Sequence, residues 1–275
     1  MTQKSSTSTS APAPAPEDTR LRHVEHAMGT VFSFDVRGAG SGAGAARTRA
    51  ALDAAVCWLH RVDEVFSTFL PDSQISRLAR DELALSRCDP DVWEVLRLCE
   101  EAERLSDGWF SARYDMENDG GSAFDPTGLV KGWAVERAAR MLVSAGAESV
   151  CLNGGGDIQL HGGPWRIGIS DPHHPGELAA IVQAHDELAV ATSGPAERGC
   201  HILDPNTGEP PVTDLASVTV VCSGLTDADA WATAAYAMGG DRARVWLEQL
   251  PGAEGFAVTS DGGTWQTSGF GRYTA

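Results

Sequence analysis

One segment of the sequence, residues 226–233, carries oxygen-bearing side chains at a spacing that could bind a metal ion. Asp229 and Thr233 are four residues apart and would share one face of a helix. Their carboxylate and hydroxyl oxygens suit a hard cation such as Mg²⁺, with a backbone carbonyl, water or phosphate oxygen needed to complete the octahedron. The segment also matches a capping box in which Asp229 pairs with Thr226 and no metal is required, and spacing alone favours that cap.

A second segment, Asn153–Asp157 (Asn-Gly-Gly-Gly-Asp), is predicted to lie between two strands. Three adjacent glycines let backbone N–H groups approach an anion or a planar ring closely, and the flanking Asn153 and Asp157 can donate to and accept from a nucleotide. The pattern is neither a GxGxxG fingerprint nor a P-loop. A plain flexible hairpin explains these glycines equally well.

A third segment, Phe124–Ala134, is predicted to be a turn that feeds a helix. A helix N-terminus presents unpaired N–H groups and the positive end of the helix dipole, so a lysine in the first turn is placed unfavourably for the helix alone. Lys131 at this place suits a bound phosphate. The alternative is an ordinary Asp-Pro turn with an exposed lysine.

A fourth region combines small hydroxyl residues with a histidine. Thr192 and Ser193 precede Gly194, and His201 opens the run His-Ile-Leu-Asp-Pro-Asn-Thr-Gly. The imidazole could act as a general base near neutral pH. A Ser/His/Asp hydrolase is the rival interpretation, but Ser193 lacks the GxSxG elbow of that class. A lone histidine is more often structural, so this region is a weak signal by itself.

Five helices and a set of short strands are predicted to position these residues. Apolar residues at spacings of three and four predict the first helix, and Asp89 followed by Pro90 marks the start of the second. Glycines end the third and fourth helices. The predicted helices span residues 45–65, 91–105, 131–145, 226–238 and 241–250.

The strands are predicted from β-rich runs bounded by Gly, Pro and Asp. These runs are residues 31–36, 149–152, 158–161, 165–170, 178–184, 188–193, 217–222, 256–259 and 264–268. Because they come in blocks rather than in strict alternation with helices, they favour an α+β fold over a doubly wound sheet. Residues 1–22, mostly Ser, Thr, Ala and Pro, are predicted to form a mobile tail ahead of one domain at 23–275.

The composition indicates a globular protein that does not bind nucleic acid. With 21 Lys plus Arg against 38 Asp plus Glu the net charge is −17. Lys4 and Lys131 are the only lysines and the arginines are scattered, so no basic patch is available for a phosphate backbone. The six cysteines lack zinc or CxxC spacing and are interpreted as small buried hydrophobes or bystanders. No apolar run of membrane-spanning length and no secretory leader are seen, which predicts a cytoplasmic protein.

In combination and in this order, the segments resemble the ApbE family of flavin transferases, which move FMN from FAD onto a Thr or Ser of an acceptor protein. The motifs that carry the resemblance are HAMGT, FSTFLPDSQISRL, DGWF, DPTGLVKGWAVE, NGGGD, ATSG, HILDPNTG and TDADAWATA. The resemblance implies an α+β fold related to the tunnelling fold, with mixed β-sheets and packed helices. It also implies FAD as substrate, Mg²⁺ as cofactor and an acceptor protein with a Ser/Thr flavinylation motif.

The resemblance assigns roles to individual residues as well. Asp229 and Thr233 would be the side-chain ligands of Mg²⁺ and the carbonyl of Val130 its backbone ligand, which reverses the preference for a capping box. His201 would activate the hydroxyl of the acceptor. The residues expected to contact FAD are Met28, Phe69, Trp109, Phe110, Ser111, Thr127, Lys131, Asn153, Gly154, Gly155, Gly156, Asp157, Thr192, Ser193, His201 and Ile202.

Two segments depart from the pattern of the family. Phe69 stands where relatives commonly carry a flavin-stacking Tyr, and Gly108–Ser111 reads Gly-Trp-Phe-Ser where they commonly read Gly-Ala-Phe-Asp. The first change keeps the ring face, and the second removes an acidic group. Three hypotheses follow: a Mg²⁺-dependent FAD:protein FMN transferase, an FAD pyrophosphatase that yields FMN and AMP, and a flavin-binding protein without catalysis.

Overall fold

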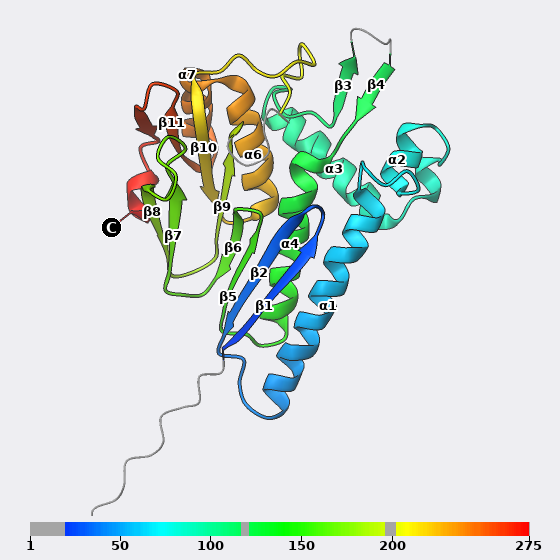
Figure 1. The fold of residues 1–275 in the computed structure, drawn as a ribbon, viewed down its shortest axis with the longest axis vertical. Helices are drawn as coiled ribbons and strands as arrows, with labels where there is room; N and C mark the ends of the chain where they lie inside the picture. The colour runs from blue at the N-terminus through cyan, green and yellow to red at the C-terminus, as the bar shows by residue number, and fades with distance from the viewer. Residues whose placement is uncertain (1–19, 117–120, 196–201, 275) are drawn as a thin grey trace, which may run out of the picture.

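An eight-stranded sheet forms the frame of the molecule (Figure 1). The computed structural model describes residues 20–116, 121–195 and 202–274. Neighbouring strands of the sheet all run antiparallel. From one edge to the other they are β1 (Leu21–Ala27), β2 (Thr30–Arg37), β5 (Ser149–Gly154), β6 (Asp157–His161), β9 (Leu188–Ser193), β10 (Leu215–Cys222), β11 (Glu254–Thr259) and β12 (Thr264–Gln266).

Helices cover one face of this sheet (Figure 1). Helix α4 lies against β5, α6 lies against β9 and β10, and α3 packs on α4 from outside. The strands turn alternate side chains toward them, as in β9, where Ala189 and Ala191 belong to the helix-side core. The helices are α1 (Ala43–Phe66), α3 (Pro90–Leu105), α4 (Thr127–Ser144), α6 (Leu225–Met238) and α7 (Gly240–Gln249).

A separate hairpin covers part of the opposite face. It consists of β7 (Trp165–Ser170) and β8 (Leu178–Ala184), which pair with each other in antiparallel register. Its buried side chains form a second core with the other set of alternate strand residues, among them Leu188 and Val190 of β9. The short 3₁₀ helix η2 (Phe270–Tyr273) adds Phe270 to this core. The sheet is therefore packed on both faces where β6, β9 and β10 run.

The remaining elements come between α1 and α4 along the chain. They are α2 (Gln74–Ala79), the 3₁₀ helix η1 (Leu85–Arg87) and the two-stranded hairpin of β3 (Arg113–Met116) and β4 (Gly121–Phe124). In the described part of the chain, no helix combines the length and the apolar character that a membrane crossing requires.

The structure confirms the α+β class and most of the predicted helices. The second predicted helix begins as expected, because Asp89 accepts a hydrogen bond from Asp91 N and Pro90 fills the first turn. The third begins at Thr127 rather than at Lys131, directly after a turn in which Asp125 Oδ1 accepts a hydrogen bond from Thr127 N (2.9 Å). The placement of Lys131 in a first turn is therefore wrong; it lies in the second.

The prediction of a capping box formed by Thr226 and Asp229 is also wrong. Helix α6 begins at Leu225 after Gly224, so Thr226 lies inside the helix and does not cap it. The predicted strands are all present, but the sequence did not indicate β1, α2 or the β3–β4 hairpin. Strand β1 begins at Leu21, two residues ahead of the predicted domain boundary. Residues 1–19 of the predicted tail lie outside the described residues.

Candidate functional site

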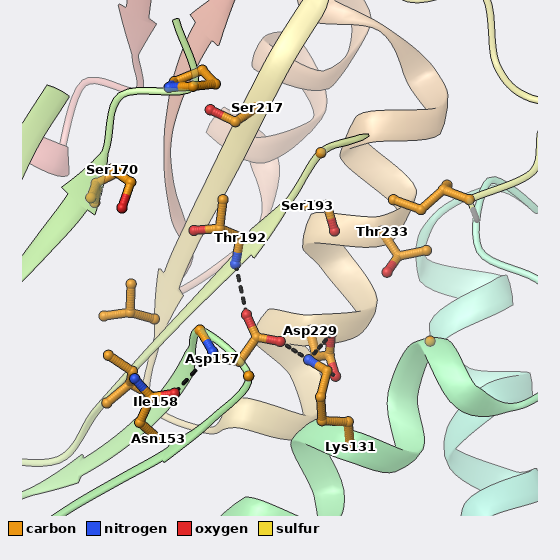
Figure 2. Close-up of a pocket in the computed structure, with 18 of the residues that line it drawn as sticks. Lys131, Asn153, Asp157, Ile158, Ser170, Thr192, Ser193, Ser217, Asp229 and Thr233 are labelled. Atoms are coloured by element: carbon orange, nitrogen blue, oxygen red, sulfur yellow. Dashed lines mark hydrogen bonds and ion pairs between the residues drawn. The ribbon is translucent and has the colours of Figure 1, made fainter. Parts of the chain in front are cut away.

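A cavity of about 290 Å³ lies where the first turns of α4 and the middle of α6 approach the β5–β6 turn (Figure 2). Strands β7 and β9 close its other sides. The lining residues are Asp125, Thr127, Gly128, Lys131, Asn153, Gly155, Gly156, Asp157, Ile158, Ile167, Gly168, Ile169, Ser170, Pro172, Val190, Thr192, Ser193, Gly194, Ile202, Ser217, Asp229 and Thr233. The cavity is therefore lined by charged side chains on one side and by apolar side chains on another.

The charged side of the cavity is built around Lys131. Its ammonium contacts the Asp157 carboxylate and lies 3.3 Å and 3.2 Å from Oδ1 and Oδ2 of Asp229. The side chains of Lys131, Asp157 and Asp229 are 13%, 5% and 9% exposed. Buried charges are costly unless they are paired, so each member of this cluster depends on the others. The alternative of an exposed lysine on an ordinary turn is wrong.

Backbone donors hold both carboxylates in place. Asp229 Oδ2 accepts a hydrogen bond from Gly132 N (2.9 Å). Asp157 Oδ1 accepts one from Thr192 N (2.9 Å) (Figure 2). A Cβ atom at Gly132 would lie 2.4 Å from Leu225 O and 2.7 Å from Asp229 Cβ. Glycine at this position therefore lets α4 and α6 approach closely enough for the bond to Asp229 to form.

The Asn153–Asp157 segment forms the turn between β5 and β6. Gly155 and Gly156 adopt φ angles of +60° and +96°, which side chains with a Cβ rarely allow. Asn153 Oδ1 accepts a hydrogen bond from Gly156 N (2.9 Å) and fixes the turn. Gly154 packs against the core behind the turn and does not line the cavity. The segment is a hairpin, as the simpler interpretation predicts, and it also forms part of the cavity wall.

Hydroxyl and apolar groups form the remaining walls. The hydroxyl oxygens of Thr192 and Thr219 lie 2.8 Å apart, and Ser193 and Ser217 come from the same two strands, β9 and β10. The apolar contribution comes from Ile158, Ile167, Ile169 and Val190. Apolar walls with a few placed polar groups are typical of small-molecule sites.

The donors around Asp229 fit a hard divalent cation. Asp229 and Thr233 both line the cavity from one face of α6, as predicted (Figure 2). Within the described ranges no three His, Cys, Asp or Glu side chains form a metal-binding group, so the set depends on hydroxyl and carbonyl oxygens as well. The cavity also carries three carboxylates, Asp125, Asp157 and Asp229, against the one ammonium of Lys131, which favours an added cation.

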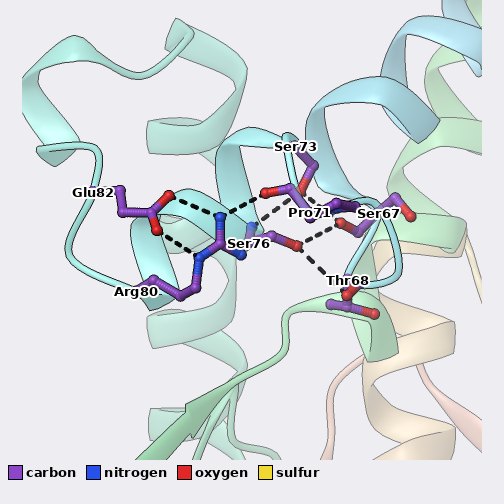
Figure 3. Close-up of polar contacts among 7 residues, drawn as sticks. All are labelled: Ser67, Thr68, Pro71, Ser73, Ser76, Arg80 and Glu82. Carbon is purple, nitrogen blue, oxygen red and sulfur yellow. Dashed lines mark hydrogen bonds and ion pairs between the residues drawn. The ribbon is translucent and has the colours of Figure 1, made fainter.

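Phe69 lies outside the cavity. It belongs to the loop formed by residues 67–73, whose anchoring contacts are drawn in Figure 3. Its side chain is 94% exposed. The carbonyl of Ser67 accepts hydrogen bonds from the hydroxyls of Ser73 (2.6 Å) and Ser76 (3.2 Å), which hold the base of the loop. The loop therefore presents an aromatic ring to solvent on a fixed support.

The Trp109–Ser111 segment also lies away from the cavity. The guanidinium of Arg242 stacks 4.6 Å from the centre of the Trp109 ring. Phe110 is buried and packs beneath Gly128 at the start of α4. The Ser111 hydroxyl is buried and donates to a neighbouring backbone carbonyl. In this structure the segment supports α4 rather than lining the cavity.

The other predicted contacts fall into three groups. Met28, in the β1–β2 turn, and Val130, buried in α4, do not line the cavity; the Met28 N–H donates to Asp63 Oδ2 (3.0 Å). Ile202 is buried and lines it. His201, the predicted base, lies outside the described residues.

Sequence reasoning missed the wall that β7 provides. Ile167, Ile169 and Ser170 come from a run that was predicted to be a strand, but nothing local to that run indicates which surface it covers. Ser217 was missed for the same reason. Asp125 also lines the cavity and was not among the predicted contacts. It is the acidic residue that opens the motif DPTGLVKGWAVE, and this position could have identified it as a candidate.

The described cysteines supply no reactive thiolate to the site. Burial raises the pKa of Cys99, Cys151 and Cys222 to about 12, so these thiols stay protonated at neutral pH. Burial also raises the pKa of Cys88, and Cys57 is an exposed free cysteine on α1. None of these residues lines the cavity.

The sheet, the α4–α6 pair and the charged cavity define an α+β protein with a preformed polar site. A family model places it further: the ApbE family model matches residues 28–116 and 112–257, and the chain belongs to the ApbE family.

Curated relatives carry one common name. The chain is 30% identical over 162 residues to an FAD:protein FMN transferase of Treponema pallidum, covering 51% of this chain and 45% of that protein. It is 34% identical over 142 residues to one of Vibrio cholerae, covering 46% and 42%. The matched region thus spans less than half the length of these relatives.

Solved structures show the same fold. The ApbE protein of Thermotoga maritima superposes with a TM-score of 0.78 at 21% identity, over 93% of this chain and 99% of that one. The flavin transferase ApbE of Vibrio cholerae gives 0.76 at 22% identity, over 92% and 99%.

Proposed function

We propose that this protein is an FAD:protein FMN transferase that uses Mg²⁺. The observation that supports this most is the buried cluster of Lys131, Asp157 and Asp229 at one side of a cavity of small-molecule character. Its relatives carry the same activity in their names. A buried, oxygen-rich site that would accept a divalent cation suits the pyrophosphate of FAD.

The proposed reaction is a phosphoryl-type transfer. The oxygen of an acceptor Ser or Thr forms a bond to the FMN phosphorus, and the bond from that phosphorus to the bridging oxygen breaks. AMP leaves with the electron pair, and the proton of the acceptor hydroxyl passes to a base. His201 is the proposed base, since an imidazole accepts a proton near neutral pH and general-base catalysis contributes about 10²- to 10⁴-fold.

Other residues around the cavity are proposed to bind the phosphates, the metal ion and the flavin. Lys131 would bind phosphate oxygens, while the N–H groups of Gly155 and Gly156 donate to Val31 O (3.0 Å) and Asn153 Oδ1 (2.9 Å) and hold the turn. Mg²⁺, held by Asp229 and Thr233, would neutralise charge that develops on the phosphate oxygens. At about 290 Å³ the cavity is at the lower end for small-molecule sites, so it would hold the phosphates and one ring while the rest of FAD extends outside it. Phe69 is proposed to contact the flavin there.

The proposal can be tested by incubating the protein with FAD, Mg²⁺ and candidate acceptor proteins. We expect a covalent flavin adduct, seen by fluorescence on a denaturing gel, which disappears with EDTA or with Asp229→Ala. Metal-dependent release of free FMN without an acceptor would show a pyrophosphatase instead. FAD that binds and stays intact under all conditions would show a flavin-binding protein without catalysis.

A further inference from the structure

The first turn of α6 is capped by side chains from two other elements. Gly224 precedes the helix and has no side chain with which to cap it. Leu225 N donates instead to Oε1 of Gln159 on β6 (2.9 Å), and Thr226 N donates to Oε2 of Glu136 on α4 (2.8 Å). Since an uncapped helix start leaves N–H groups unsatisfied, these two buried acceptors fix where α6 begins.

Glu136 makes the stronger of the two attachments. Its Oε2 also accepts a hydrogen bond from the Thr226 hydroxyl (2.6 Å), so one carboxylate oxygen holds both the backbone and the side chain of that residue. The Glu136 residue is 6% exposed. A Cβ at Gly224 would lie 3.1 Å from Glu136 Oε2, so the glycine cap leaves room for the carboxylate. The other oxygen, Oε1, pairs with the exposed guanidinium of Arg140.

The same face of α4 reaches the proposed metal ligands. Three of its positions, four residues apart, meet α6 in turn: the Gly128 backbone lies beside Thr233, Gly132 N bonds Asp229, and Glu136 bonds Thr226. The two glycines allow close approach but do not stop one helix from sliding or rotating against the other. Glu136 supplies the directional contact at the end of this row.

We propose that Glu136 is a positioning residue for the metal site. Through Thr226 it sets the rotation and axial position of α6, and hence where Asp229 and Thr233 present their oxygens to a divalent cation. This inference rests on the proposed function, since it assumes that these two residues bind the metal. Loss of a group bonded directly to a metal ligand typically weakens metal affinity 10- to 100-fold; Glu136 acts one step further out, through Thr226 on the same helix as the ligands.

The test is a titration of the full chain with Mn²⁺ in the absence of FAD, followed by electron paramagnetic resonance. We expect Glu136→Ala to weaken Mn²⁺ binding at least about tenfold. Glu136→Gln keeps an oxygen that can accept both bonds and should stay within about threefold of wild type. Arg140→Ala removes only the partner of the other oxygen and is the matched control, with affinity unchanged within about twofold.

The contradicting results are distinct. Wild-type affinity in Glu136→Ala, or affinity in Glu136→Gln as weak as in Glu136→Ala, overturns the capping role. If Glu136→Ala does not fold, Thr226→Val decides: we expect binding about threefold to tenfold weaker, and unchanged binding overturns the inference. FMN transfer by wild type is measured in parallel. A wild type that transfers FMN but fails to bind Mn²⁺ overturns this inference alone, and one that does neither overturns the proposed function with it.

Discussion

The charged side of the cavity and the loop at residues 67–73 are both held in place, but they differ in what they leave exposed. The Lys131–Asp157–Asp229 cluster is buried and satisfied by its own members and by backbone donors. The loop is anchored through serine hydroxyls and through Arg80, which donates to Pro71 O (2.7 Å) (Figure 3). Its Phe69 ring is nevertheless exposed to solvent.

This difference follows from the physics of the two kinds of group. Charges cannot be buried alone, so a polar site inside a fold must be complete before any ligand arrives. An aromatic ring can stay exposed to water before a ligand binds, because the free-energy cost of exposure is limited to the apolar surface of the ring, which the ligand would later cover. We therefore expect the phosphate side of the site to be preformed and the proposed flavin contact to form on binding.

The largest expected effect comes from removing the cation of the cluster. Lys131→Met leaves Asp157 and Asp229 facing each other while buried, and we expect the free energy of unfolding at pH 7 to fall by about 3 kcal/mol. Added Mg²⁺ should restore part of this stability, because a cation bound to the native state stabilises it by linkage. Chemical denaturation with and without Mg²⁺ measures both. Arg104→Ala, which breaks an exposed pair with Glu101, is the control with little expected change.

A second test acts on the helix contact alone. Gly132→Ala would drive a methyl group into Leu225 O, and we expect a loss of about 2 kcal/mol of stability together with weaker Mg²⁺ binding. Gly271→Ala is the matched control, because nothing lies within 4 Å of a Cβ built there. Equal stability of the two variants would show that the close approach of α4 and α6 does not matter.

Truncation of the exposed Phe69 ring should lower the affinity for FAD and leave the stability of the protein unchanged. Phe69→Ala is expected to weaken FAD binding about three- to tenfold through lost stacking, with stability unchanged within about 0.5 kcal/mol. Val212→Ala, another fully exposed apolar side chain, should change neither quantity. Fluorescence titration with FAD measures the affinity. Unchanged affinity in Phe69→Ala would remove the loop from the proposed site.

The smallest effect is expected from the support of the loop. Ser76→Ala deletes the hydroxyl that donates to the Ser67 carbonyl and should weaken FAD binding about twofold to fivefold. If the hydroxyl acts by placing the ring, the double variant with Phe69→Ala should bind no more weakly than Phe69→Ala alone. Additive losses would mean that Ser76 acts by another route.

The sequence predicted elements whose causes are local. The start of α3 follows from Asp89 and Pro90, which lie beside it, and the predicted strands followed from alternating or apolar runs between turn residues. Strand β1 was missed because Leu21–Ala27 has polar residues on most positions and gains its place by pairing with β2. Its pattern alone does not indicate a strand.

Contacts between distant residues could not be predicted in the same way. The motifs identified Lys131, Asp157 and Asp229 as candidates, but their mutual pairing depends on how β5, β6 and α6 meet α4 in the folded chain. The cap on Thr226 comes from a residue 90 positions away, so local sequence suggested a capping box that does not exist. Phe69 was assigned from resemblance, and no spacing rule places its ring.

The proposed FMN transfer depends on the carboxylate of Asp229, the proposed metal ligand at the buried side of the cavity. It is tested most directly by comparing covalent flavin transfer, with FAD, Mg²⁺ and an acceptor protein, between Asp229→Asn and Asp227→Asn. Both residues lie on α6, but Asp229 lines the cavity and Asp227 is exposed. We predict a loss of at least about 100-fold for Asp229→Asn and wild-type transfer for Asp227→Asn. Transfer by Asp229→Asn at the wild-type rate would contradict the account.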